Sequence, residues 1–193
     1  MDANDVAESY FNELVNRSMI QPVMADFSHE VSSCRIHDMM LDLIRSKSAE
    51  ENFITVIDTP QAVTAMHKNI RRISIQHENA EHGVRLATIN GPLSQVRSIA
   101  VFRCVCQASF MEFMYIRVLI LKHLDTEELN LTGMCGLLYM KIVLVSRCKN
   151  LELPSQIAQL RQLKTINISG ERFAPVQQKV PRGTKLFLTI RSS

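Results

Sequence analysis

Apolar and polar residues follow two different periods along this chain. The first, near the N-terminus, is the spacing of an α-helix. Over residues 5–17 the apolar side chains recur three or four residues apart, which predicts an amphipathic helix; they are Val6, Tyr10, Phe11, Leu14 and Val15. From Asp38 onward the same spacing returns, at Met40, Leu43, Ile44 and Lys47. A second helix is therefore predicted after residue 37.

Between the two predicted helices lie two short apolar stretches separated by a polar turn. The first holds Pro22, which points to a sheet edge because proline cannot donate to a strand ladder, and the second ends near His37. Asp38 is predicted to be the N-cap of the second helix, where a carboxylate accepts a backbone N–H and favours the helix dipole. Helix, hairpin and helix, in this order, form the latter part of a winged-helix domain.

Farther along, the period lengthens to a unit of 20 to 26 residues. Five segments share the pattern apolar-x-x-apolar-x-apolar: IRRISI (70–75), VRSIAV (96–101), IRVLIL (116–121), MKIVLV (140–145) and LKTINI (163–168). This period is typical of leucine-rich repeats, in which each unit contributes one strand and buries its apolar face by stacking on its neighbours. A sixth strand is expected in TKLFLTI (184–190).

The leucine-rich-repeat pattern has Asn or Cys three residues beyond each strand, and only some of the units match it. Cysteine stands there in two units, Cys104 and Cys148, whereas the other three have Glu78, Leu124 and Glu171. The segment CKNLELPSQIAQLRQLKTINI fits best, with the spacing of a return to the next strand at Leu151, Leu153, Pro154, Ile157 and Leu160. An α/β domain with a parallel sheet is the alternative, although the links lack helical periodicity and a glycine-rich first turn.

These patterns predict an α/β chain in two parts. Residues 1–60 are expected to be the C-terminal part of a winged-helix subdomain, and residues 61–193 a short solenoid of five to six degenerate leucine-rich repeats. Charge follows the same division: the first part has eleven acidic and four basic residues, the second eight acidic and eighteen basic. Opposite charge favours docking of the two parts on each other, or docking of the basic part on another acidic surface, within the limit that salt screening sets.

Candidate chemistry is sparse. The five cysteines have no C-x-x-C spacing and are expected to be buried free thiols, and the histidines have neither ligand spacing nor a paired nucleophile. We therefore expect no enzyme activity, no metal and no small-molecule substrate. The sequence has no run of eighteen apolar residues and no secretory signal. A cytoplasmic location is expected, with the nucleus or the periphery of the plasma membrane as alternatives.

Three features together resemble a known family: AESYFNELVNRSMIQPV (7–23), CRIHDMMLDLIRS (34–46) and the degenerate repeats. They resemble the plant intracellular immune receptors of the nucleotide-binding (NB-ARC), leucine-rich-repeat class, most closely the grass members with an N-terminal coiled coil. The resemblance covers nearly the whole chain. It implies a role in disease resistance and defence, exerted through protein–protein interaction.

The resemblance also gives a role to the strand-to-helix junction. In that family a Met-His-Asp motif lies there, and His37 and Asp38 match its second and third positions, with Ile36 in place of methionine. The family's histidine contacts the β-phosphate of bound ADP, which suits an imidazole near neutral pH, and its aspartate stabilises the closed, inactive state. This chain has no G-x-x-x-x-G-K-S/T loop. We therefore expect a truncated receptor fragment without the nucleotide-binding core or bound ADP or ATP, in which both residues keep only a structural role.

The expected partners are proteins: the nucleotide-binding part of an intact relative, a pathogen effector, or a guarded host protein. The candidate contact residues are Arg71, Arg72, Arg97 and Arg117, in the basic second part. Two other functions stay open, a winged-helix DNA reader and a leucine-rich-repeat scaffold unrelated to immunity. A DNA reader needs a basic recognition helix, and the helix after His37 is mixed in sign: Asp42, Arg45, Lys47, Glu50 and Glu51. Nucleic acid is therefore not an expected partner.

Overall fold

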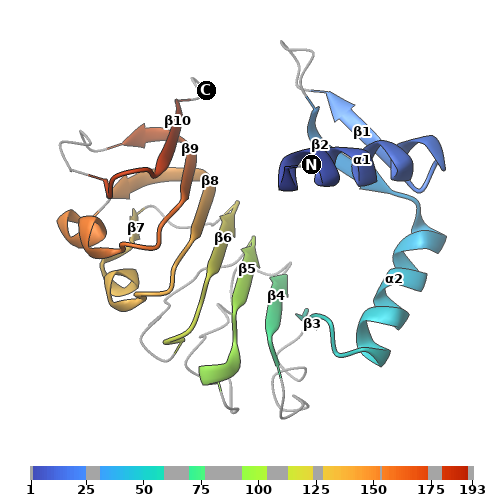
Figure 1. The fold of residues 1–193 in the computed structure, drawn as a ribbon, viewed down its shortest axis with the longest axis horizontal. Helices are drawn as coiled ribbons and strands as arrows, with labels where there is room; N and C mark the ends of the chain where they lie inside the picture. Colours follow the sequence, from blue (N-terminus) through green and yellow to red (C-terminus); the bar gives the residue numbers. More distant parts are fainter. Residues whose placement is uncertain are drawn as a thin grey trace. The chain divides into compact units, whose positions relative to one another are not determined.

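The chain is divided into two compact units, Met1–Glu51 and Asn52–Ser193, called here the first and the second unit. The computed structural model describes residues 2–24, 31–58, 70–76, 93–103, 113–123, 128–152, 154–173 and 180–190. Helices and an antiparallel hairpin make up the first unit, whereas the second is built on a parallel sheet (Figure 1). The chain is thus a mixed α/β protein with a parallel sheet.

In the first unit the predicted helix, hairpin and helix are all present. Helix α1 spans Ala3–Asn16, strand β1 (Ile20–Met24) pairs antiparallel with β2 (Val31–Ile36), and helix α2 spans Asp38–Glu50. The helical spacing is reflected in α1, where Val6, Phe11 and Val15 are half-buried. Pro22 stands opposite Cys34 in the two-stranded sheet, where both strands are edges and a missing N–H is tolerated.

The second unit carries an eight-stranded sheet whose main path runs in chain order. Its strands are β3 (Thr55–Ile57), β4 (Arg72–Gln76), β5 (Ser98–Phe102), β6 (Val118–Lys122), β8 (Ile142–Glu152), β9 (Thr165–Phe173) and β10 (Lys185–Ile190), with β7 (Glu128–Asn130) pairing to β8 off the path. All six predicted strands are therefore confirmed. Figure 1 shows them side by side, each parallel to the next. The sequence pattern did not predict β3 or β7.

One register runs through the sheet. The residues that end the five apolar patterns pair in one row, which Ile57 of β3 and Leu188 of β10 continue at either end: Ile57, Ile75, Val101, Leu121, Val145, Ile168 and Leu188. All of them except Leu188 are buried. Side chains alternate along a strand, so β5 and β6 bury every second residue. The predicted spacing of the repeats is thus the spacing that brings apolar residues of neighbouring strands together.

The links between strands complete the core. Short 3-10 helices, η3 (Leu93–Gln95), η5 (Thr132–Gly136) and η6 (Ser155–Gln159), precede β5, β8 and β9, and each buries one apolar residue, respectively Leu93, Met134 and Ile157. These pack in one cluster with the strand residues, among them Ile99, Leu119 and Ile166. Within the described part of the second unit the links contain no α-helix.

Some sequence positions lie elsewhere than the pattern placed them. Cys148 and Glu171, expected just beyond a strand, lie inside β8 and β9, because these strands extend past the apolar segment and stay paired as far as Leu151 and Phe173. Glu78, Cys104, Leu124 and Leu153 lie outside the described residues. Among the described helices, none is long and apolar enough to cross a membrane.

Truncating a buried residue of a central strand should be costly. Leu119→Ala removes a fully buried side chain from the middle of the sheet, and we expect it to lower the free energy of unfolding by about 2–5 kcal/mol because the cavity collapses only partly. Urea unfolding of the full chain, followed by far-UV circular dichroism, measures this. Ile120→Ala, the half-buried neighbour on the opposite face, is the control, and an equal loss in both variants would contradict the assigned register.

Candidate functional site

The junction of β2 and α2 places the His-Asp pair at the start of a helix. Strand β2 ends at Ile36, and His37 follows as the N-cap with φ −67° and ψ 143°. Its carbonyl oxygen accepts the backbone N–H of Leu41 at 2.9 Å, which closes the first helical turn. The side chains of His37 and Asp38 are both exposed. The two residues therefore lie next to each other on the surface, at the positive end of the α2 dipole.

The prediction that Asp38 caps α2 is wrong. The extended conformation of β2 continues through His37, so the cap falls one residue earlier and Asp38 becomes the first helical residue. The His37 side chain makes no capping hydrogen bond. Asp38 still lies in the first turn, where a carboxylate interacts favourably with the helix dipole. Because the imidazole is not used for capping, it is available to another group.

In the second unit, cations gather where the strands begin. The backbone N–H of Arg97 donates to the carbonyl of Arg71 at 2.8 Å, and Arg117 bonds to Arg97 in the same way at 2.7 Å. Lys141 bonds to Arg117, and Lys164 to Lys141, each at 2.8 Å. These five residues form one row across the sheet, called here the basic row. Neighbouring members are about 4.8 Å apart, the separation of paired strands.

Three of the four predicted contact arginines belong to the basic row: Arg71, Arg97 and Arg117. The fourth, Arg72, is the first residue of β4; its guanidinium lies 4.3 Å from the centre of the Phe53 ring and donates to the Phe53 carbonyl at 3.3 Å. Sequence reasoning missed Lys141 and Lys164. The signal was present, because all five aligned segments have Arg or Lys as their second residue.

Two tyrosines lie beside the basic row. Tyr115 and Tyr139 each precede a row residue by two positions, and their ring centres are 5.4 Å apart with a tilt of 39°. The guanidinium of Arg97 lies 5.0 Å from the centre of the Tyr115 ring. The residues before the tyrosines are Met114 and Leu138, with exposed fractions of 55% and 60%. These four residues, called here the apolar strip, border the basic row.

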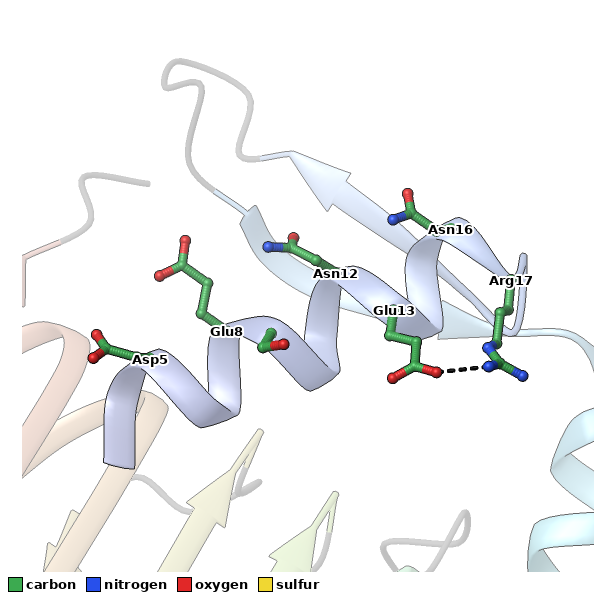
Figure 2. A pocket seen from close by; sticks show the side chains of 7 residues that line it. Asp5, Glu8, Asn12, Glu13, Asn16 and Arg17 are labelled. Atoms are coloured by element: carbon green, nitrogen blue, oxygen red, sulfur yellow. Dashed lines mark ion pairs between the residues drawn. The ribbon is translucent and has the colours of Figure 1, made fainter. Parts of the chain in front are cut away.

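A polar hollow runs along α1. Its seven lining residues are Asp5, Glu8, Ser9, Asn12, Glu13, Asn16 and Arg17. Figure 2 shows their side chains arranged along α1, with the Arg17 guanidinium and the Glu13 carboxylate facing each other in an ion pair of 2.7 Å. All seven belong to α1 or directly follow it. The hollow is thus the polar flank of a single helix and not a site formed between elements.

Two cysteines, Cys34 and Cys135, are free but not buried as expected. Cys34 is exposed, because it lies on an edge strand of a two-stranded sheet, and Cys135 in η5 is half-buried. Burial raises the pKa of the Cys135 thiol, since the thiolate loses solvation. Cys104 and Cys106 lie outside the described residues. Within the described ranges no three His, Cys, Asp or Glu side chains come together as metal ligands.

Comparison with known proteins identifies relatives for nearly the whole chain. The family model of the disease resistance protein winged helix domain matches residues 1–44. Disease resistance protein PIK6-NP of Oryza sativa subsp. japonica is 38% identical over 165 residues, which are 84% of this chain and 16% of that protein. Disease resistance protein RGA5 of the same organism is 33% identical over 88% of the chain, and the probable disease resistance RPP8-like protein 4 of Arabidopsis thaliana 30% over 97%. The chain spans about a sixth of the length of the rice relatives.

A side chain at position 37 that accepts a capping hydrogen bond should stabilise the first turn of α2. In His37→Ser the hydroxyl accepts a backbone N–H of the first turn, and we expect this to stabilise the helix start by about 1 kcal/mol. Amide hydrogen exchange of Met40 and Leu41 reports the gain as slower exchange. His37→Ala offers no acceptor and serves as the control; equal protection in the two variants would show that the side chain at this position does not limit the helix start.

The alkylation rates of Cys34 and Cys135 should follow their burial. At pH 8 we expect iodoacetamide to alkylate Cys34 faster than Cys135, because Cys135 is half-buried and its raised pKa keeps more of it as the unreactive thiol. Peptide mapping by mass spectrometry resolves the two sites. Addition of urea should remove the difference, and a persistent difference in the unfolded chain would trace it to local sequence instead of burial.

Proposed function

Because the chain belongs with the plant disease resistance proteins over 84% of its length, we propose that it is part of an immune receptor and acts by binding other proteins. The winged-helix match over residues 1–44 adds support, since it places the chain's first unit in the same class of proteins. A scaffold unrelated to immunity would account for the parallel sheet alone but not for this match.

One observation carries the protein-binding proposal: six strands, 20 to 26 residues apart, pair in a single register with equivalent residues opposite each other. This is the arrangement expected of leucine-rich repeats, whose units stack side by side and offer one continuous surface of exposed strand residues. The links, with their short 3-10 helices, agree with that architecture. We therefore infer a short leucine-rich-repeat solenoid, and its exposed face is the surface offered to partners.

The His-Asp pair has a place in this proposal. In an intact receptor, His37 would donate to a phosphate oxygen of bound ADP, and the start of α2 would favour the anion through its free N–H groups and dipole. The unused imidazole and its exposure fit this contact. Asp38, next to it, would orient the ring and stabilise the closed state. The sequence of this chain contains no phosphate-binding loop. The remaining phosphate contacts would therefore come from other parts of the receptor.

Within this proposal the partners are the nucleotide-binding part of the same or a related receptor and the effector or guarded protein it recognises. The acidic surplus of residues 1–60 and the basic surplus of residues 61–193 support charge-assisted docking of the second unit. Screening by physiological salt confines the attraction to groups within about 8 Å of each other. Specificity for a partner would therefore come from residues of the basic row and the apolar strip that contact the partner directly.

The closed-state role of Asp38 can be tested in a chimera in which this chain replaces the matching segment of Disease resistance protein PIK6-NP. We expect the chimera to be silent in leaf tissue, and Asp38→Val to trigger cell death without any effector, because the closed state loses its stabilising carboxylate. Asp42→Val, an exposed aspartate one turn along α2, is the matched control. If both variants stay silent, or both trigger cell death, Asp38 has no special role.

A further inference from the structure

Three basic residues stand at the carboxyl ends of neighbouring strands in the second unit. Arg103 directly follows β5, His123 directly follows β6, and Arg147 lies within β8. Each stands two residues after the last buried residue of its aligned apolar segment. The backbone N–H of Arg103 donates to the carbonyl of Lys122 at 3.1 Å, and that of His123 to the carbonyl of Ser146 at 3.0 Å. The three residues, called here the end row, therefore lie side by side on parallel strands about 4.8 Å apart (Figure 1).

All three residues have the left-handed backbone conformation, with φ of 50°, 55° and 56°. Residues other than glycine rarely adopt it, because their Cβ atom comes too close to the following carbonyl oxygen. Among the other non-glycine residues described, only Ser18 and Asn52 share it, and each lies two residues after a helix, where this conformation is common. Glycine would adopt it at no steric cost. A basic side chain at this position in three successive units therefore points to a use for that side chain.

The left-handed turn brings these side chains out of the core face of the sheet. In a continued strand Arg103 would face the same side as the buried Val101, because side chains alternate. Instead Arg103 and Arg147 are exposed, and His123 is half-buried. Arg147 is also an extra residue in β8, since the pairing with β9 shifts by one residue at this point. Bulges of this kind re-aim a side chain and are frequent next to active sites.

We propose that the end row binds a phosphomonoester, the group carried by a phosphorylated side chain or by a small phosphorylated molecule. A phosphoryl group has three acceptor oxygens and a charge of about −1.5 to −2 at pH 7, so one group can accept from all three residues. Arginine presents a planar fork of donors that binds phosphate oxygens bidentately. The imidazole of His123 adds a donor between the two arginines, and Lys122, the residue before it, adds positive charge.

The charge of the end row favours a phosphomonoester over a carboxylate. In the described part of the chain neither Arg103 nor Arg147 has an ion pair with an acid, and both ion pairs found there lie in the first unit. Like charges on adjacent strands repel each other, and a doubly charged group bound between them relieves that repulsion. A carboxylate has one charge and two oxygens, so it would satisfy one arginine fork and leave the other without a partner.

The end row is also too short for a nucleic-acid backbone. On the side of β9 it stops at Gly170, which is buried and has no side chain. Single-stranded nucleic acid needs a basic groove that follows its backbone over several nucleotides. Three residues that span two strand separations, about 10 Å, match one phosphoryl group instead. The inference goes beyond the receptor function proposed above and stands without it, because it concerns the phosphoryl group alone.

The test measures binding to the full chain of a fluorescein-labelled Gly-Ser peptide with one central phosphoserine. We expect saturable binding by fluorescence anisotropy, and binding at least about tenfold weaker when serine or glutamate replaces the phosphoserine. Arg103→Gly combined with Arg147→Gly should weaken binding of the phosphopeptide by at least about tenfold, because both bidentate contacts are lost. The melting temperature of this variant should equal or exceed that of the parent chain, because glycine relieves the left-handed strain.

The matched control is Arg161→Gly combined with Arg182→Gly, which removes the same charge at exposed residues of the second unit outside the end row. It should leave binding within about twofold. If the first glycine pair proves less stable than the parent, Arg103→Gln with Arg147→Gln retains a side chain at both positions and should weaken binding to the same extent.

Competition with glucose 6-phosphate identifies the source of the phosphoryl group. Equal affinity of the sugar phosphate and the phosphopeptide assigns the end row to small phosphorylated molecules as well, whereas a preference of at least about tenfold for the peptide assigns it to phosphorylated proteins. Equal binding of the phosphoserine and glutamate peptides, or equal weakening by the two glycine pairs, would overturn the proposal. So would a labelled oligo-dT that binds more tightly than the phosphopeptide and is weakened by the glycine pair in the end row, which would assign the row to nucleic acid.

Discussion

The second unit depends on the burial of one row of apolar side chains in a fixed register. Because strand residues alternate between two faces, a slip of one residue would turn every buried member of that row to the other face. The row runs through seven paired strands and is buried in all of them except β10, where Leu188 is exposed. A shift in one strand would therefore have to propagate to its neighbours. Burial of this row constrains each link between strands, because the link must bring the next strand into register with the one before.

The basic row is a consequence of that register. After Arg71, the backbone N–H of each row residue donates to the carbonyl of the preceding row residue. The buried residues on either side impose this order. Five separate positions, each 20 to 26 residues after the one before, become one line of charge only when the strands pair. A surface of this kind needs no dedicated scaffold, because the same packing that stabilises the sheet also spaces the cations at the strand separation of about 4.8 Å.

The first unit obeys a different constraint. Its sheet has only two strands, so the position of the His-Asp pair depends on where the extended conformation ends and the helix begins. That change comes after His37, which leaves the imidazole at the N-cap without a capping bond and puts Asp38 in the first turn. A serine or aspartate at the cap would satisfy the helix better. The proposed contact with a phosphate gives a reason for a histidine at this position in spite of that cost.

Much of the architecture followed from the sequence alone. Helical spacing identified α1 and α2, and the apolar pattern identified six of the seven strands from β4 to β10, all except the short β7. The pattern is visible in these strands because residues on one face of a strand recur at every second position. Only the tertiary structure decided the rest. Three-residue strands such as β3 are too short to show a period, and the cap residue depends on backbone angles. The Arg and Lys residues at the second position of the aligned segments are visible in the sequence, but only strand pairing brings them side by side. Local periodicity determines which face of an element is buried, whereas surfaces made of residues far apart in the chain exist only after the strands have found their register.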